Sequence, residues 1–348
     1  MGSNTKPQGI FQASNNAIST PIPVCQRNNQ HSKIPVFHYS ASYSTPSHKL
    51  LVRIKGCGNI GPMKKVGVIC NSKRQHAADI FDRLSRKAES LGWALYADAA
   101  SAEHLPSATV IELDEFASTV DVLLAMGGDG TVLFCANLLN GTKVPLLGIN
   151  LGSLGFLTAA GEDDLETTLD ALHAGRCTSA PRIVADCTVI RQGEPGKLFR
   201  VLNDAVIGFG GSSRIVRLEL TVNGEAISTF ACDGLIVCTP TGSTGHSLSA
   251  GGPILQPGSN AFGISVICPH TLSNRPLVIP DSSVIEITVQ ASHKTLILSI
   301  DGQDVETLAT GDSVHITRSA EPAHFLYPPD YSYFSVLRQK LHWRGSNL

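Results

Sequence analysis

The chain has 348 residues, of which 42% are hydrophobic and 16% are charged, so it is long enough and apolar enough to form two cores. Its 27 basic and 29 acidic residues nearly balance, which argues against a large nucleic-acid-binding surface. No run approaches the ~18 consecutive apolar residues that a membrane span requires. We therefore expect a soluble protein of two domains that binds neither nucleic acid nor a membrane.

Residues 1–62 differ in composition from the rest of the chain, because they contain no Asp or Glu. Such a Ser-, Asn- and Pro-rich segment cannot bury enough apolar surface to fold alone, so we expect a disordered extension. Its composition resembles an organelle transit segment without the usual Arg richness; the alternative is that translation starts at Met63. The expected compartment is the cytoplasm, or an organelle if residues 1–62 are a transit segment. The basic residues of the segment are Lys6, Arg27, Lys33, Lys49, Arg53 and Lys55.

The 9 Cys residues form no C-x-x-C pair, and the 12 His residues show no zinc-type spacing. Most of the Cys residues stand inside apolar runs, which is typical of small buried side chains in a reducing compartment. The sequence therefore predicts no structural metal.

Residues 63–175 alternate short apolar runs with helical periods, which is the pattern of a parallel sheet with flanking helices. We expect an α/β domain of the Rossmann-like kind here. The expected strands are 66–70, 120–125 and 144–149, and the expected helices are 77–91, 132–139 and 162–174.

Residues 176–320 contain many short β-rich runs separated by Gly, Pro and Asn, so we expect a mostly antiparallel, all-β second domain. Asn223-Gly224 stands between two such runs and predicts a two-residue hairpin turn. The segment 321–348 is expected to pack back on the first domain through a helix over 331–341, with Phe334, Leu337 and Leu341 on its apolar face.

The run Gly127-Gly128-Asp129-Gly130-Thr131 follows the apolar run 120–126, where a buried strand hands over to a helix. Ligands of open α/β sheets bind at this end of the strands, and a helix N-terminus favours phosphate. Gly127, Gly128, Gly130 and Thr131 are therefore candidate phosphate-binding residues. Asp129 could accept a proton from an attacking hydroxyl or hold a magnesium ion; the alternative is that it only caps the helix.

Residues 239–253 carry six hydroxyl side chains close together. Hydroxyls at this density can bind phosphate, ribose and base edges without a charge, although a Ser/Thr-rich surface loop is the simpler interpretation. The hydroxyl residues are Thr239, Thr241, Ser243, Thr244, Ser247 and Ser249.

These two segments, with three further motifs in the same order, resemble the ATP-NAD kinase family over about residues 63–344. The family motifs are matched by 125–131, 148–157, Leu202-Asn203-Asp204, 233–253 and Asp330-Tyr331-Ser332-Tyr333-Phe334. The resemblance implies the two-domain architecture of NAD kinases and transfer of the γ-phosphoryl group of ATP to the 2′-hydroxyl of the adenosine ribose of NAD, giving NADP and ADP. It also implies a divalent cation, with Mg²⁺ expected, and a homodimer or homotetramer. Polyphosphate is the alternative donor.

The resemblance also assigns roles to particular residues. Asp129 corresponds to the proton acceptor, with Gly130 beside it against the dinucleotide. Asn203 corresponds to an adenine-binding residue, and Asp204 to a ribose-binding residue. The other positions implied to contact NAD are Arg214, Asp233, Thr244, Gly245, His246, Ser247, Leu248, Ser249 and Gln303.

Two departures from the family pattern accompany this resemblance. Asp204 stands where Glu is more common, and Gly245-His246 replaces the commoner Ala-Tyr. The alternative functions are a lipid kinase of the same superfamily, which shares the Gly-Gly-Asp-Gly element, and a catalytically silent NAD-binding sensor. A Rossmann dehydrogenase is disfavoured, because no Gly-x-Gly-x-x-Gly follows the first expected strand.

Overall fold

The computed structural model describes residues 63–71, 77–153, 155–208, 215–292 and 296–343, all within one compact unit, Ile54–Leu348. The expected disordered extension, residues 1–62, lies outside the described residues. In the part described, no helix is both long and apolar enough to cross a bilayer.

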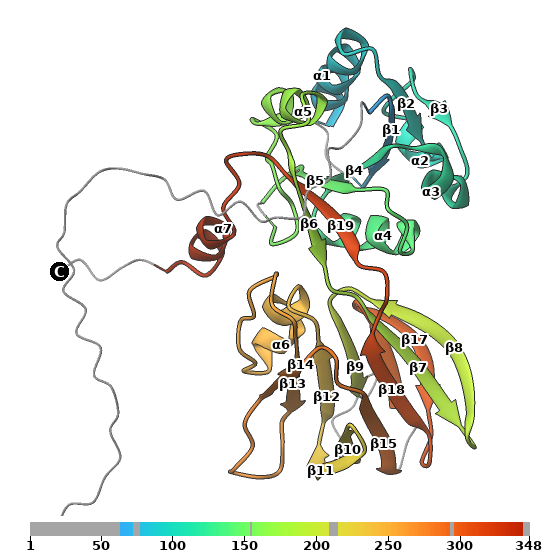
Figure 1. The fold of residues 1–348 in the computed structure, drawn as a ribbon, viewed down its shortest axis with the longest axis vertical. Helices are drawn as coiled ribbons and strands as arrows, with labels where there is room; N and C mark the ends of the chain where they lie inside the picture. The colour runs from blue at the N-terminus through green and yellow to red at the C-terminus, as the bar shows by residue number, and fades with distance from the viewer. Residues whose placement is uncertain (1–62, 72–76, 154, 209–214, 293–295, 344–348) are drawn as a thin grey trace, which may run out of the picture. The chain divides into compact units, whose positions relative to one another are not determined.

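The first part of the structure is built on a seven-stranded sheet with the strand order β3-β2-β1-β4-β5-β19-β6 (Figure 1). Strands β1 to β5 are parallel, whereas β6 runs antiparallel to β19. The bounds are β1 Lys65–Cys70, β2 Ala94–Ala97, β3 Thr109–Val110, β4 Val122–Gly127, β5 Leu146–Asn150, β6 Thr178–Arg182 and β19 Ala323–Tyr327.

Helices cover both faces of this sheet, and alternate residues of the central strands enter two separate cores. Leu124 and Met126 of β4 face one core with α1 and α5, while Leu123 and Ala125 face the other with α4. Ion pairs join α1 to α5 between Arg83 and Glu166 at 2.5 Å and between Lys87 and Asp170 at 2.6 Å. The helices are α1 Ala77–Ser90, α2 Ala99–Ala102, η1 Leu113–Glu115, α3 Phe116–Thr119, α4 Asp129–Leu139 and α5 Leu165–His173.

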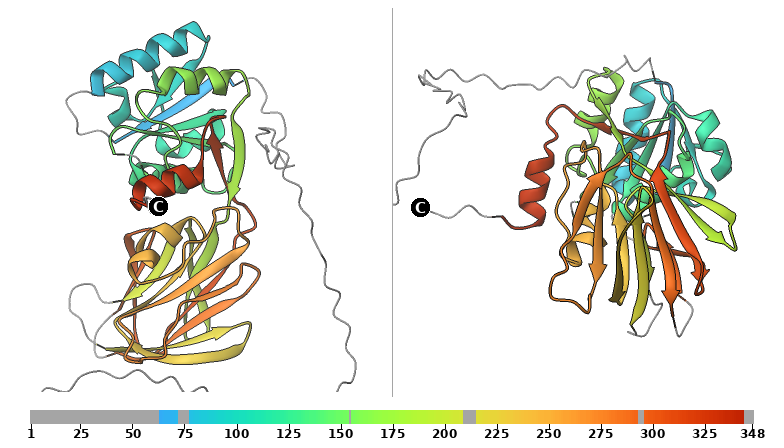
Figure 2. Two further views of the ribbon diagram at one scale, coloured as in Figure 1. Left: turned by 90° about the vertical axis from the view of Figure 1, so that its left-hand side faces the viewer. Right: turned by 60° about the horizontal axis from the view of Figure 1, so that its bottom comes forward.

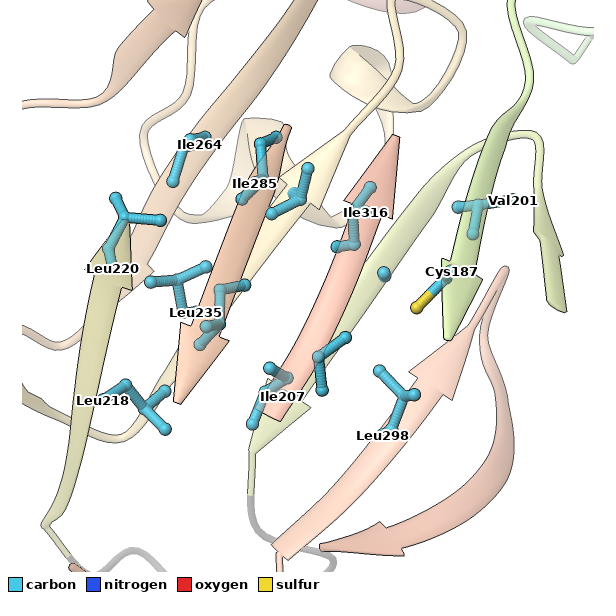
Figure 3. Close-up of a cluster of buried hydrophobic side chains, with 14 of the residues drawn as sticks. Cys187, Val201, Ile207, Leu218, Leu220, Leu235, Ile264, Ile285, Leu298 and Ile316 are labelled. Atoms are coloured by element: carbon cyan, nitrogen blue, oxygen red, sulfur yellow. The ribbon is translucent and has the colours of Figure 1, made fainter. Parts of the chain in front are cut away.

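Two six-stranded antiparallel sheets form the second part, and they enclose a single core (Figure 3). Period-two alternation explains this packing, because Ile285, Ile287 and Val289 point inward while Glu286 and Thr288 are only half-buried. One sheet has the order β11-β10-β15-β18-β7-β8 and the other β14-β13-β12-β9-β16-β17. The bounds are β7 Ala185–Arg191, β8 Glu194–Val201, β9 Asp204–Gly208, β10 Val216–Val222, β11 Glu225–Cys232, β12 Gly234–Cys238, β13 Ala261–Ile267, β14 Leu277–Pro280, β15 Ile285–Ala291, β16 Leu296–Ile300, β17 Gln303–Leu308 and β18 Ser313–Arg318.

Both predicted fold classes are confirmed: a parallel α/β sheet first and antiparallel sheets after it. The predicted hairpin turn also forms, with φ of 52° at Asn223 and 80° at Gly224 between β10 and β11. Most of the described Cys residues are buried, as expected, although Cys268 is exposed.

The C-terminal helix differs in detail from the expectation. Helix α7 spans Tyr333–Lys340 (Figure 2). It buries Val336 and Leu337, but Phe334 is 55% exposed. Of the three residues expected on the apolar face, only Leu337 is buried, because Leu341 is half-buried and Phe334 is exposed. The buried face of the helix is therefore narrower than the sequence predicts, and it starts at Val336, two residues after Phe334.

Candidate active site

Asp129 is the first residue of α4 and follows directly on the turn that ends β4. Its Oδ2 accepts the backbone N–H of Phe156 at 2.9 Å, and its Oδ1 accepts that of Leu157 at 3.0 Å. Because both oxygens are engaged, the orientation of this half-buried carboxylate is fixed. Each oxygen still has a second lone pair with which it can accept another proton donor.

The glycines around Asp129 serve two different purposes. A Cβ at Gly155 would overlap the Asp129 carboxylate, 2.7 Å from its Cγ, and a Cβ at Gly127 would overlap the Thr131 side chain. Gly128 and Gly130, in contrast, are exposed and have open space where a Cβ would stand. Of the four predicted phosphate-binding residues, only Gly128 and Gly130 therefore offer a free backbone surface, while Gly127 and Thr131 are packed inside the turn.

Several hydroxyls of the 239–253 loop hold the loop itself together. Ser243 Oγ donates to the Pro240 carbonyl at 2.7 Å and accepts the Leu255 N–H at 2.9 Å, and Ser247 Oγ lies 3.1 Å from Ser265 Oγ. The loop forms a 3₁₀ turn, η2 Gly242–Thr244, and a short helix, α6 His246–Ser249.

The open face of this loop is made by a smaller set of the predicted residues. Gly245, His246 and Ser249 are exposed, Thr244 and Leu248 are half-buried, and Ser247 is buried. The side chains available to a ligand therefore lie at the start and end of α6.

Asp204 is the first residue of β9 and is only 5% exposed. Burial, reinforced by the nearby charge of Asp301, raises its pKa to about 7, although the backbone N–H of His246 donates to the carboxylate and opposes the shift. Asp204 therefore holds a proton more readily than an ordinary aspartate does. It also ties the Asn203-Asp204 segment to the start of α6.

Asp301 is the residue that organises this part of the site, and sequence reasoning assigned it no role. Its carboxylate accepts the backbone N–H groups of Leu202 at 3.1 Å, Asn203 at 2.6 Å and Asp204 at 3.2 Å. The side chain of Asn137 donates to it as well, yet burial still raises the pKa of Asp301. The sequence did contain a turn signal at this position, because Asp-Gly favours a two-residue hairpin turn. Asp301-Gly302 forms such a turn between β16 and β17, with φ of 51° and 81°.

Asn137 links Asp129 to the Asn203-Asp204 segment. It lies on α4, the helix that Asp129 begins, and its side chain donates to Asp301. Eight residues of helix separate them, a rise of ~12 Å. Asp129 and the Asn203-Asp204 segment are therefore joined through one helix and one carboxylate.

Asn203 has an unusual environment for an amide. Its carbonyl oxygen accepts the Thr239 N–H at 2.9 Å, and Gly242 packs against its backbone so closely that a Cβ there would lie 2.6 Å from the Asn203 Cα. Its side-chain Oδ1 is buried and has no hydrogen-bond partner among the described residues. A buried acceptor of this kind is costly unless a ligand supplies the donor.

Asp233 stands apart from this group in the described residues, whereas Gln303 lies two residues after Asp301 on the same hairpin. Gly234 pairs with Gly208 and Cys238 with Asp204, so Asp233 is at the other end of the β9–β12 pair from Asp204. Five residues of strand correspond to roughly 17 Å. Gln303 is exposed at the start of β17, and Arg214 lies outside the described residues.

Family comparisons cover most of the chain. Residues 66–177 match the ATP-NAD kinase N-terminal domain, and residues 202–327 match the ATP-NAD kinase C-terminal domain. The chain is 37% identical over 281 residues to an NAD kinase of Geobacter sulfurreducens, covering 81% of this chain and 99% of that protein. It is 39% identical over 285 residues to an NAD kinase of Citrifermentans bemidjiense, again covering 81% and 99%.

Solved structures share the fold. A yeast NADH kinase complexed with NADH superposes with a TM-score of 0.76 at 24% identity, covering 82% of this chain and 89% of that one. An NAD kinase from Archaeoglobus fulgidus in complex with ATP superposes with a TM-score of 0.64 at 24% identity, covering 81% of this chain and 100% of that one. The predicted resemblance and the predicted enzyme class, a kinase, are confirmed: the chain belongs to the ATP-NAD kinase family.

Proposed function

We propose that this protein is an NAD kinase that transfers the γ-phosphoryl group of ATP to the 2′-hydroxyl of the adenosine ribose of NAD, giving NADP and ADP. The relatives named NAD kinase support the activity. The observation that carries the mechanism is the carboxylate of Asp129, held by two backbone N–H groups beside the exposed backbone of Gly128 and Gly130.

In the proposed reaction, Asp129 accepts the proton of the 2′-hydroxyl through a free lone pair. The ribose oxygen then forms a bond to the γ-phosphorus as the bond from phosphorus to the β–γ bridging oxygen breaks, and ADP leaves with that electron pair. A ribose hydroxyl is a poor nucleophile while it keeps its proton. General-base assistance of this type is worth ~10²–10⁴-fold in rate.

The proposed NAD site uses the side chains of Asn203 and Asp204, whose backbone Asp301 holds. The free Oδ1 of Asn203 can accept the 6-amino group of adenine, and Asp204 can bind ribose hydroxyls as acceptor when ionised or as donor when protonated. His246 replaces a Tyr at the rim, and its exposed imidazole can stack on the base.

The donor phosphates are proposed to lie against Gly128 and Gly130 at the N-terminus of α4, where backbone N–H groups and the helix dipole favour negative charge. Among the described residues, no three His, Cys, Asp or Glu side chains gather to hold a metal ion. The divalent cation is therefore proposed to enter as the metal–ATP complex. Polyphosphate, which offers the same phosphate chemistry, is the alternative donor.

The expected homo-oligomer gives Asp233 a proposed role. At roughly 17 Å from Asp204 along the strands, Asp233 could meet the nicotinamide half of the same NAD from a second copy of the chain. Mixing Asp233→Ala with Asp129→Asn tests this, because each mixed assembly would regain intact sites only if the residues come from different copies. Unchanged summed activity would contradict it.

The proposed activity is tested by incubating the purified chain with γ-labelled ATP and Mg²⁺ in the presence of NAD, NADH, diacylglycerol or sphingosine. Label in NADP is the expected result, and parallel reactions with polyphosphate measure the donor preference. Label in a lipid would show the lipid kinase instead. NAD binding with no label transferred would show a silent sensor.

A further inference from the structure

Arg182, the last residue of β6, is a buried cation that has no anionic partner in the part of the chain that the structure describes. It is 4% exposed, its Nη2 donates to the Tyr327 hydroxyl, and its guanidinium lies 5.5 Å from the ring centre of Phe325 and 5.4 Å from that of Tyr327. Its Nε has no hydrogen-bond partner in the described part of the chain, where no carboxylate forms an ion pair with it either. Two aromatic faces and the Tyr327 hydroxyl offset this charge, although buried cations are usually paired with anions.

Arg182 lines a pocket of ≈ 660 Å³ between β6, the segment 256–260 and the start of α7. This volume is within the range of small-molecule sites and far above that of a single water or ion. The walls are mostly apolar. They include Pro181, Pro257, Pro322, Pro328, Pro329 and Tyr331.

A second donor faces the same pocket. Tyr333 is a lining residue of this pocket, and its hydroxyl is buried without a hydrogen-bond partner among the described residues. Burial raises the pKa of Tyr333, while the charge of Arg182 opposes the rise. The other arginine of the pocket, Arg318, is already neutralised by Asp281 at 2.5 Å. The group that this pocket still lacks is therefore a negatively charged hydrogen-bond acceptor.

We propose that this pocket binds a small organic anion, whose carboxylate or phosphate group accepts from Arg182 Nε and the Tyr333 hydroxyl and whose flat apolar body lies against the prolines and Tyr331. None of the pocket residues belongs to the proposed NAD site, so the two sites do not overlap. The proposal also gives a role to the 330–334 motif, which the phosphoryl transfer does not use.

The test uses the full chain and isothermal titration with benzoate and phenyl phosphate, with benzamide as the neutral analogue of benzoate. We expect at least one of the two anions to bind, and to bind about tenfold or more tighter than benzamide, because charge-assisted hydrogen bonds are lost with the neutral group. Saturating NAD should not displace the anion. Equal binding of benzamide, failure of both anions to bind at millimolar concentration, or displacement by NAD would each overturn the proposal.

Variants locate the site. Arg182→Met and Tyr333→Phe should each weaken anion binding, whereas Arg200→Met should not, because Arg200 is a partly buried arginine that bonds Ser319 and the Glu321 carbonyl outside the pocket. If Arg182→Met does not fold, hydrogen exchange of the unmodified protein replaces it. Anion-dependent protection confined to residues 178–183 and 328–333 supports the proposal, and protection elsewhere contradicts it.

Discussion

The orientation of Asp129 depends on a residue that lacks a side chain. Gly155 approaches the Asp129 carboxylate so closely that any Cβ must displace it or the 155–157 backbone that holds it. We predict that Gly155→Ala lowers kcat by about tenfold or more, since a misplacement of ~1 Å in a catalytic group can cost ~10²-fold. Steady-state kinetics of NADP formation measure the effect.

Gly161→Ala is the matched control, because Gly161 belongs to the segment that follows and a Cβ there meets no atom within 4 Å. It should retain the kcat of the unmodified protein. Equal kcat values for the two variants would show that the close approach of Gly155 does not matter for catalysis.

Asp204 makes the stability of the protein depend on pH. Its folded pKa of about 7 exceeds the ordinary carboxyl value of 3.8, so the folded state binds the proton more tightly than the unfolded state does. The stabilising contribution of the protonated group is therefore fully present below about pH 4 and is lost as the pH rises to 7. Asp204→Asn mimics the protonated form, and we predict that it is more stable than the unmodified protein at pH 8, by on the order of a few kcal/mol.

Urea unfolding of both proteins between pH 3.5 and 8 measures this difference. The two free energies of unfolding should nearly coincide at the acidic end, which serves as the internal control, and should diverge as the pH rises. Asp301 titrates together with Asp204, so the divergence reports the pair. A difference that does not change with pH would contradict the assigned burial effect.

At the scale of elements, the β16–β17 hairpin acts on the site through its turn. Asp301→Asn exchanges one acceptor oxygen for a donor, so at least one N–H of the 202–204 segment loses its partner, at a cost of ~1–3 kcal/mol. We predict that the KM for NAD rises about fivefold or more while kcat changes less, because this segment is proposed to bind adenine and ribose.

Asp312→Asn is the control for this prediction. Asp312 also accepts a turn N–H, that of Ala309 at 2.9 Å, and pairs with Arg191, but it contacts none of the proposed site residues. Its KM for NAD should stay unchanged. A similar rise in both variants would indicate general loosening of the second part of the protein instead of a positioning role for Asp301.

Elements were predictable from the sequence where the pattern that specifies them spans only a few neighbouring residues. Gly127 to Thr131 stand at the end of a buried strand as expected, and the Asn223-Gly224 turn forms. Asp301-Gly302 carries the same type of turn signal, but the bonds of Asp301 reach residues 97 to 99 positions away. Spacing along the chain contains no information on a contact of that kind. For the same reason, spacing along the chain did not predict that the hydroxyls of Ser243 and Ser247 hold the 239–253 loop in place.

At the scale of the whole molecule, the class of each part followed from its periodicity, whereas the strand order did not. Strand β19 returns from the end of the second part to lie beside β5, and β6 pairs with β19. Both strands are short, and their partners are distant in sequence. Consequently the pocket beside Arg182, which these two strands help to form, was also not predictable.

The central claim is that the two parts of the chain build one site in which Asp129 takes the proton from bound NAD. The most direct test is single-turnover formation of NADP from saturating ATP and NAD by the unmodified protein, Asp129→Asn and Thr158→Val. Thr158→Val removes another bond of the same loop, from the Gly155 N–H at 3.1 Å, and so controls for loosening. We predict a ~10²–10⁴-fold loss for Asp129→Asn and a change of only a few-fold for Thr158→Val. Transfer by Asp129→Asn within about tenfold of the unmodified protein would contradict the account.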